Sequence, residues 1–343
     1  MLKWLLRLSL LHLRPRSWLV RQLRARFERD GYYFSPEFSG RAACFRLALH
    51  LRAGGTAPLA LVPDYICNVV HHALEKAGFE VRSYNTDELF EPDCKELEEQ
   101  LQSRPVGILL TASVFGSSAA LDAIGSGPLH DVIVNRHVHV IADLCQDISL
   151  VNQLPSTLGP QLSAIVSFND KSFLGMMGGG VIATQELTPP HRRLSCRLRL
   201  KLYELLWRKV RSASQASQAA AARVRLCDVA GSAARPSYDY SYCRDFPYTC
   251  VPYKATRLQL IMALIGLEDL PQILRRRRDF ATDHAVDLLQ TKYYLNSPYV
   301  VARQIDLSLA VLRRRKGSYA LHGHPDISLR PDLSIWHNKG FLD

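Results

Sequence analysis

The chain has 343 residues, of which 47% are apolar and 22% charged, so it is long and apolar enough to bury a large core. Lysine and arginine outnumber aspartate and glutamate by 43 to 32, and the resulting net charge of +11 could attract nucleic acid, anionic lipid or phosphorylated substrates. Eight scattered cysteines without C-x-x-C pairs or zinc-type spacing argue against a disulfide framework and against a metal site.

The N-terminal stretch MLKWLLRLSLLHLRPRSWLVRQLRARF mixes leucines with arginines and one lysine. Arg7, His12 and Arg14 interrupt every apolar run, so the stretch fits neither a signal peptide nor a membrane span. One interpretation is a cationic amphipathic helix that lies on a membrane surface. The other, which we favour, is a helix that packs on the body of the protein or on a second subunit.

From residue 39 the pattern alternates between helix and strand. It predicts helices over 41–52, 65–77 and 93–102, and strands over 59–63, 79–84, 107–113, 137–143, 163–168 and 180–184. Strands this apolar, separated by helical segments, indicate a mainly parallel sheet that is covered on both faces. Ligands bind at the carboxyl ends of such strands. Because Asp143 and Lys171 both lie at predicted strand ends, we expect them to share a site.

The chain changes character after Pro189. A cationic helical stretch, RRLSCRLRLKLYELLWRKVR, is followed by an irregular loop over 228–252, by helices over 255–267 and 270–278, and by a small mixed α/β part from Tyr293. The cationic stretch is either a solvated helix face, the commoner case, or a patch for an anionic partner. We divide the chain into an N-terminal basic amphipathic segment, a large domain and a small C-terminal α/β domain, over 1–38, 39–225 and 226–343.

The stretch SFNDKSFLGMMGGGVIAT places Lys171 between a short apolar strand and three glycines, Gly178 to Gly180. A surface lysine needs no such setting, because its ammonium group prefers water. The glycines allow positive φ angles or a close approach of the backbone to another group. Lys171 is therefore either an ordinary loop lysine or a nucleophilic amine that is held in a crevice.

Six blocks of the sequence follow one another in the order typical of one enzyme family. They are SGRAACFRLAL at 39–49, LVPDYICNVVHHALEKAGFEV at 61–81, VFG with LDAI at 114–124, VIADLCQDIS at 140–149, the lysine and glycines at 171–179, and YKATRLQLIMALIGLEDLPQILRRRR at 253–278. On these blocks the chain resembles the DegT/DnrJ/EryC1/StrS family of pyridoxal-phosphate aminotransferases. The resemblance covers residues from about 39 to 290 and implies fold type I.

The resemblance also assigns roles to single residues. It implies that Lys171 binds pyridoxal 5'-phosphate covalently and that Asp143 lies beside the pyridine nitrogen, with Gln146 near the ring hydroxyl. The cofactor phosphate is expected at the N-terminus of a helix, where free amides and the helix dipole favour an anion. The residues expected there are Gly40, Arg41 and Ala42, with Ser167 as a further candidate.

Four residues depart from the family pattern, and one of them is Ser167, which is one residue closer to Lys171 than in the family. Arg41 stands where the family usually has threonine, and an arginine there would hold the phosphate or block it. Cys67 stands where an aromatic ring normally stacks on the cofactor, so that stacking is lost or comes from Tyr65. Lys254 replaces an arginine, and the two are not interchangeable at a fork-shaped contact.

The resemblance implies an aminotransferase that works as a homodimer with its site at the subunit interface. Its acceptor would be a nucleotide- or lipid-linked keto-sugar or another biosynthetic carbonyl compound, and its amino donor an amino acid. The scattered cysteines, which fit reduced thiols, favour the cytoplasm. Two other functions stay open: a sugar dehydratase or lyase with the same cofactor, and a cofactor-free binding or scaffold protein. We expect no nucleic-acid partner, because the basic residues are scattered over several helices. An anionic membrane surface remains a candidate partner.

Overall fold

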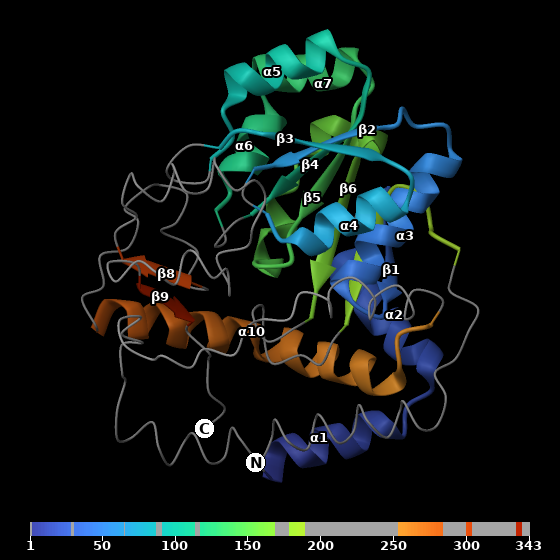
Figure 1. The fold of residues 1–343 in the computed structure, drawn as a ribbon. Helices are drawn as coiled ribbons and strands as arrows, with labels where there is room; N and C mark the ends of the chain where they lie inside the picture. Colours follow the sequence, from blue (N-terminus) through green and yellow to red (C-terminus); the bar gives the residue numbers. More distant parts are fainter. Residues whose placement is uncertain are drawn as a thin grey trace, which may run out of the picture.

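Seven strands form one sheet in the order β1-β7-β6-β5-β4-β2-β3 (Figure 1). The bounds of these strands are β1 Tyr33–Glu37, β2 Leu59–Pro63, β3 Glu80–Tyr84, β4 Val106–Ala112, β5 His139–Asp143, β6 Leu162–Ser167 and β7 Gly179–Ala183. The five strands from β3 to β6 run parallel, whereas β7 is antiparallel to β6 and β1 is antiparallel to β7. The sheet is therefore mainly parallel, as the sequence predicts.

This computed structural model describes residues 2–28, 31–64, 66–86, 91–113, 117–168, 178–188, 253–283, 300–303 and 334–337. Within these ranges, the last two form a separate antiparallel pair of strands, β8 (Val300–Arg303) and β9 (Ser334–His337). The stretch 189–252, which includes the cationic helix and the loop predicted there, lies outside the described residues.

Helices cover both faces of the sheet, and each face has its own apolar cluster. On one face, α3 (Gly40–Ala53) and α4 (Asn68–Lys76) pack against the strands. The other face is covered by α2 (Arg16–Phe27), α5 (Cys94–Ser103), α6 (Ala119–Gly125), α7 (Pro128–Asn135) and α10 (Arg257–Asp283), with two short 3-10 helices, η2 (Ile148–Gln153) and η3 (Ser156–Gln161). All residues of β2, β6 and β7 are buried for this reason, which explains their continuous apolar sequences.

Two features of the sheet and its helices differ from the sequence prediction. Strand β1 is not among the predicted strands, because its sequence YFSPE is short and contains Pro36. Proline is tolerated there because β1 is the edge strand of the sheet. The prediction of two helices over 255–267 and 270–278 is wrong, since α10 is continuous through Pro271. Leu267 and Leu270, on either side of the expected break, both pack against the core.

The N-terminal segment forms two helices, α1 (Leu2–His12) and α2, with Pro15 at the N-cap of α2. Helix α1 lies along α10 (Figure 1). Arg7 Nη1 donates a hydrogen bond of 2.8 Å to Asp269 Oδ1, and Arg7 also forms an ion pair with Glu268. The expectation that this segment packs on the body of the protein is thus confirmed for the inner face of α1.

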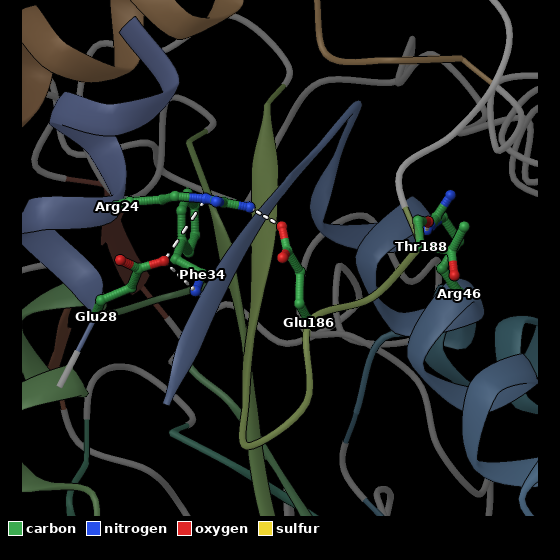
Figure 2. A network of polar contacts seen from close by, with 6 residues as sticks. All are labelled: Arg24, Glu28, Phe34, Arg46, Glu186 and Thr188. Carbon is green, nitrogen blue, oxygen red and sulfur yellow. Dashed lines mark hydrogen bonds and ion pairs between the residues drawn. The ribbon is translucent and has the colours of Figure 1, made fainter. Parts of the chain in front are cut away.

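Polar contacts join β1 to its neighbours (Figure 2). The Phe34 amide of β1 donates to Glu28 Oε1 over 3.4 Å, and Arg24 Nε lies 3.6 Å from the same oxygen. Arg24 also forms an ion pair with Glu186, which follows β7. These contacts connect the end of α2, the edge strand and the segment after β7.

His139 makes the stability of this fold depend on pH. Its Nε2 atom lies 2.9 Å from Ser163 Oγ, and burial, aided by the neighbouring His50, lowers the pKa of His139 from 6.5 to about 4. As the pH falls from 6.5 to 4, an unfolded histidine binds a proton and the folded one does not, so the free energy of unfolding decreases across this window by up to about 3 kcal/mol.

Glutamine cannot titrate. We therefore predict that His139→Gln makes the free energy of unfolding depend less on pH between 6.5 and 4. The measurement is urea unfolding at a series of pH values from 7 to 4, compared with the wild type. The control His137→Asn changes an exposed histidine, and asparagine tolerates the positive φ angle of 54° at this position. This control is expected to follow the wild-type curve. Equal acid slopes for wild type and His139→Gln would contradict the prediction.

Candidate active site

The carboxyl ends of the central parallel strands place several polar groups at one edge of the sheet. Asp143 is the last residue of β5, and Ser167 is the last residue of β6. Ser113 follows β4, and both its amide and its hydroxyl donate to the Asp143 carbonyl oxygen, over 3.1 and 3.2 Å. The backbone at Asp143 is thereby fixed to the neighbouring strand.

The Asp143 carboxylate lies in a desolvated position. Its Oδ1 atom accepts a hydrogen bond of 2.9 Å from the Cys145 amide. Burial raises the pKa of Asp143, and the bonds from Cys145 lower it by less. Among the described residues, no lysine, arginine or histidine contributes to this shift. A carboxylate in this position would be stabilised by a cationic partner.

The N-terminus of α3 meets this edge of the sheet. Ser39 is the N-cap, and its hydroxyl accepts the Ala42 amide over 3.1 Å. A methyl group on Gly40 would lie only 2.9 Å from Cys145 Sγ, 2.9 Å from Ser167 Cβ and 3.2 Å from Ser167 Oγ. The helix start, Ser167 and the turn after Asp143 are therefore in direct contact.

Strand β7 brings a second glycine against the same helix start. A methyl group on Gly179 would lie 2.5 Å from the Gly40 amide nitrogen, 2.7 Å from the Ser39 carbonyl carbon and 2.6 Å from the Val166 carbonyl oxygen. All three neighbours are backbone atoms, so no side-chain rotation can relieve the overlap. Gly179 permits the backbone approach that its place in the glycine run suggests.

The structure brings together four of the residues predicted from the sequence, Gly40, Ala42, Asp143 and Ser167. Of the amides expected to bind phosphate, that of Ala42 already donates to the Ser39 cap. Gln146 is partly buried three residues beyond Asp143, and Arg41 is partly buried in the first turn of α3.

Of the remaining predicted residues, Cys67 and Lys254 lie within the described ranges, and the Cys67 thiol contributes to the raised pKa of Cys145. Cys67 is exposed and is the N-cap residue of α4. Lys254 is partly buried just before α10. Tyr65, Lys171 and the Val114–Gly116 block lie outside the described residues.

Two thiols near Asp143, those of Cys44 and Cys145, were not expected at the site from the sequence. Burial and the Asp143 charge raise the pKa of Cys44, which is fully buried in α3. The pKa of Cys145 is raised by burial first, then by Asp143 and by the neighbouring thiols of Cys44 and Cys67. Three elements distant in sequence contribute these thiols. The position of Cys145, two residues after Asp143, could have indicated its thiol, whereas Cys67 was already expected at the site.

No model of a protein family matches the chain, and no curated relative matches it either. Solved structures do. A sugar aminotransferase from Micromonospora echinospora is 14% identical, with a TM-score of 0.56 over 98% of this chain and 92% of that one. An aminotransferase of the DegT/DnrJ/EryC1/StrS type from Brucella abortus is 15% identical, with a TM-score of 0.51 over 96% and 86%.

A third solved structure is a GDP-4-keto-6-deoxymannose-3-dehydratase with bound GDP-perosamine. It is 15% identical, with a TM-score of 0.54 over 92% of this chain and 86% of that one. The chain therefore has the fold of the DegT/DnrJ/EryC1/StrS aminotransferases. The fold type I architecture inferred from the six sequence blocks is confirmed.

The described residues fit the cofactor that this fold type carries. The helix start at Gly40, with Ser167 in contact, offers main-chain dipoles and a hydroxyl for a phosphate. The Asp143 carboxylate, whose pKa burial raises, offers an anion for a protonated ring nitrogen. In the described part of the chain, no group of three or more acidic, histidine or cysteine side chains could hold a metal ion.

We predict that Gly179→Ala destabilises the fold by about 3 kcal/mol or more, because its methyl group would overlap three backbone atoms. The measurement is the midpoint and slope of urea unfolding. The control is Gly54→Ala at the end of α3, where the new methyl would lie 3.4 Å from the nearest carbonyl oxygen. We expect that control to change the free energy of unfolding by less than about 1 kcal/mol. Similar losses in both variants would contradict the close approach.

Proposed function

We propose that this protein is a pyridoxal-phosphate-dependent aminotransferase that transfers an amino group to a carbonyl acceptor. One observation carries the proposal: the partly buried Asp143 carboxylate, the helix start at Gly40 and the Ser167 hydroxyl lie at one edge of a fold type I sheet. These groups match the three demands of the cofactor, which are an anion for the ring nitrogen, a phosphate site and a strand-end position.

When bound, pyridoxal phosphate supplies an electron sink that allows an amino group to move between two carbon atoms. Asp143 would accept a hydrogen bond from the protonated ring nitrogen and so keep it protonated. The first turn of α3 and the Ser167 hydroxyl would orient the phosphate. Lys171 would hold the cofactor covalently, and its released Nζ atom would take up and return a proton. A partly desolvated position favours the neutral amine that this role requires.

We propose a keto-sugar linked to a nucleotide or a lipid as the acceptor and an amino acid as the donor. The similar structures support this class, since they include a sugar aminotransferase and a dehydratase that acts on a GDP-linked keto-sugar. The dehydratase is the second candidate function. In the dehydratases of the family, histidine takes the place of the lysine, so the presence of Lys171 favours the aminotransferase.

We further propose that the enzyme is a homodimer with its site at the subunit interface and that it works in the cytoplasm. The support for the dimer is the resemblance to the family, and the support for the cytoplasm is the scattered cysteines, which fit reduced thiols. In the described part of the chain, no helix is long and apolar enough to cross a membrane. Sedimentation velocity of the purified protein tests the dimer, which is expected at about twice the mass of 38.7 kDa.

We predict that the purified protein, with added pyridoxal phosphate, shows a visible absorption band from a carbon–nitrogen double bond to Lys171. Borohydride should abolish the band and leave a pyridoxyl group on Lys171, which peptide mass spectrometry detects. Lys171→Ala should show neither change, whereas the control Lys76→Ala, in α4, should behave as the wild type. If the wild type takes up no cofactor, the aminotransferase proposal fails and a cofactor-free binding protein of the same fold replaces it.

We predict that Asp143→Asn lowers the rate of amino transfer by about a hundredfold or more, because a neutral amide does not keep the ring nitrogen protonated. The measurement is single-turnover conversion of an amino donor, followed at the cofactor absorption band. The matched control is Asp131→Asn, an exposed position in α7. A wild-type rate in the Asp143→Asn variant would remove Asp143 from the site.

A further inference from the structure

Helix α1 has apolar residues on two opposite faces. On the inner face, Leu8 and Leu11 pack against the core, together with Trp18 of α2. Arg7 secures this face through Glu268 and Asp269 of α10. The inner face is thus fully explained by packing within the protein.

The outer face is a stripe of three leucines that the protein itself does not bury. Leu6, Leu10 and Leu13 keep 58%, 54% and 80% of their surface exposed. Spacings of four and three residues place them on one side of α1 and of the turn that follows it. Of five exposed large apolar side chains in the described part of the chain, these three lie within eight residues. A clustered stripe of this kind marks an interaction site more often than scattered single residues do.

The N-terminal segment that carries the stripe is basic and has no acidic residue of its own. The first 27 residues contain no aspartate or glutamate, and they contain seven basic residues: Lys3, Arg7, Arg14, Arg16, Arg21, Arg24 and Arg26. Two of these, Arg7 and Arg24, are ion-paired with acidic side chains from later in the chain. Arg14, Arg21 and Arg26 are exposed, and the Arg14 guanidinium lies 5.3 Å from the centre of the Trp18 ring.

We propose that the outer face of α1, defined by Leu6, Leu10 and Leu13, binds the surface of an anionic lipid bilayer. The leucines would enter the boundary between headgroups and acyl chains, and the exposed arginines would contact the anionic headgroups. Helix α1 has 11 residues and is about 16 Å long, which suits a helix that lies in the plane of the interface. Among the described elements, α1 lies at the end opposite to α5 (Figure 1).

A second copy of the chain fits this face less well than a lipid surface does. In a symmetric dimer the same patch meets itself, so the exposed arginines of two acid-free segments would face one another. Like charges placed together oppose association. An anionic bilayer instead offers opposite charge and an apolar layer at once. This inference does not depend on the cofactor or on the proposed reaction.

The test is co-sedimentation of the full chain with vesicles. We expect binding to vesicles of phosphatidylcholine with phosphatidylglycerol, weak binding to pure phosphatidylcholine, and release by added salt. The triple variant Leu6→Gln, Leu10→Gln and Leu13→Gln should bind the anionic vesicles at least about tenfold more weakly. Glutamine keeps the helix propensity, so α1 should still form.

Control variants show whether the loss of any exposed leucine, or the loss of positive charge anywhere on the protein, weakens binding equally. Leu49→Gln changes an exposed leucine of α3 that keeps 41% of its surface accessible, and it should bind vesicles as the wild type does. Arg21→Gln with Arg26→Gln should weaken binding. Lys95→Gln with Arg104→Gln, at α5 on the opposite end of the molecule, removes the same charge and should weaken it much less.

Three outcomes would overturn the proposal: a wild type that stays in the supernatant with anionic vesicles, a triple variant that binds as tightly as the wild type, or equal losses in the two charge variants. A triple variant with an altered mass by sedimentation velocity and unaltered vesicle binding would show that a second copy covers the stripe. Because no step uses cofactor or substrate, failure here leaves the proposed reaction intact.

Discussion

The start of α3 is in backbone contact with β6 and β7, and the candidate site depends on that contact. Gly179 lies so close to Ser39 and Gly40 that a methyl group would reach 2.5 Å from an amide nitrogen. Gly40 in turn lies against Cys145 and Ser167. Two glycines from distant parts of the chain therefore let a helix N-terminus reach the carboxyl edge of the sheet, a position that favours the binding of an anion. Any larger residue at either position would move the helix away from the strand ends.

The same edge holds a carboxylate at a cost in stability. Burial raises the pKa of Asp143, and the bonds from Cys145 offset only part of that effect. The residue is held by its carbonyl, which accepts both the amide and the hydroxyl of Ser113. An acid that is fixed at a strand end and shielded from water can bind a cationic group of a ligand. It contributes little to the stability of the fold. The surrounding thiols add bulk and no charge at neutral pH, since their pKa values are raised as well.

Most of the sheet could be predicted from the sequence because a strand that is covered on both faces must be apolar throughout. LALVP and SAIVSF are such runs, and β2 and β6 occupy these positions within one residue. Edge strand β1 has no such run, and its Pro36 is tolerated only because of its place in the sheet. Helix α10 continues through Pro271 because Leu267 and Leu270 pack on the core, which local sequence does not reveal.

The candidate site was predictable to the extent that its residues stand at strand ends or in blocks that resemble the family. Asp143 and Ser167 meet the first condition, and Gly40 meets the second. The contact of Cys44 with the surroundings of Asp143 joins α3 to β5, which are about a hundred residues apart, so no spacing rule indicates it. The fold can be similar at about 14% identity because it is specified by the burial pattern and a few glycines. The other side chains can differ without changing the fold.

Helix α10 connects the proposed membrane face to the candidate site. Near its start, Gln259 Nε2 donates 2.9 Å to the carbonyl oxygen of Phe38, two residues before α3 begins. The side-chain nitrogen of Gln259 thus binds the backbone just before α3, and its Oε1 atom accepts the Thr256 amide over 2.8 Å. Further along the same helix, Glu268 and Asp269 hold α1 through Arg7. About nine residues of continuous helix separate the two attachments, about 14 Å. A bilayer bound to the outer face of α1 would therefore stand at a fixed distance and orientation from the strand-end site, which suits an acceptor presented at a membrane.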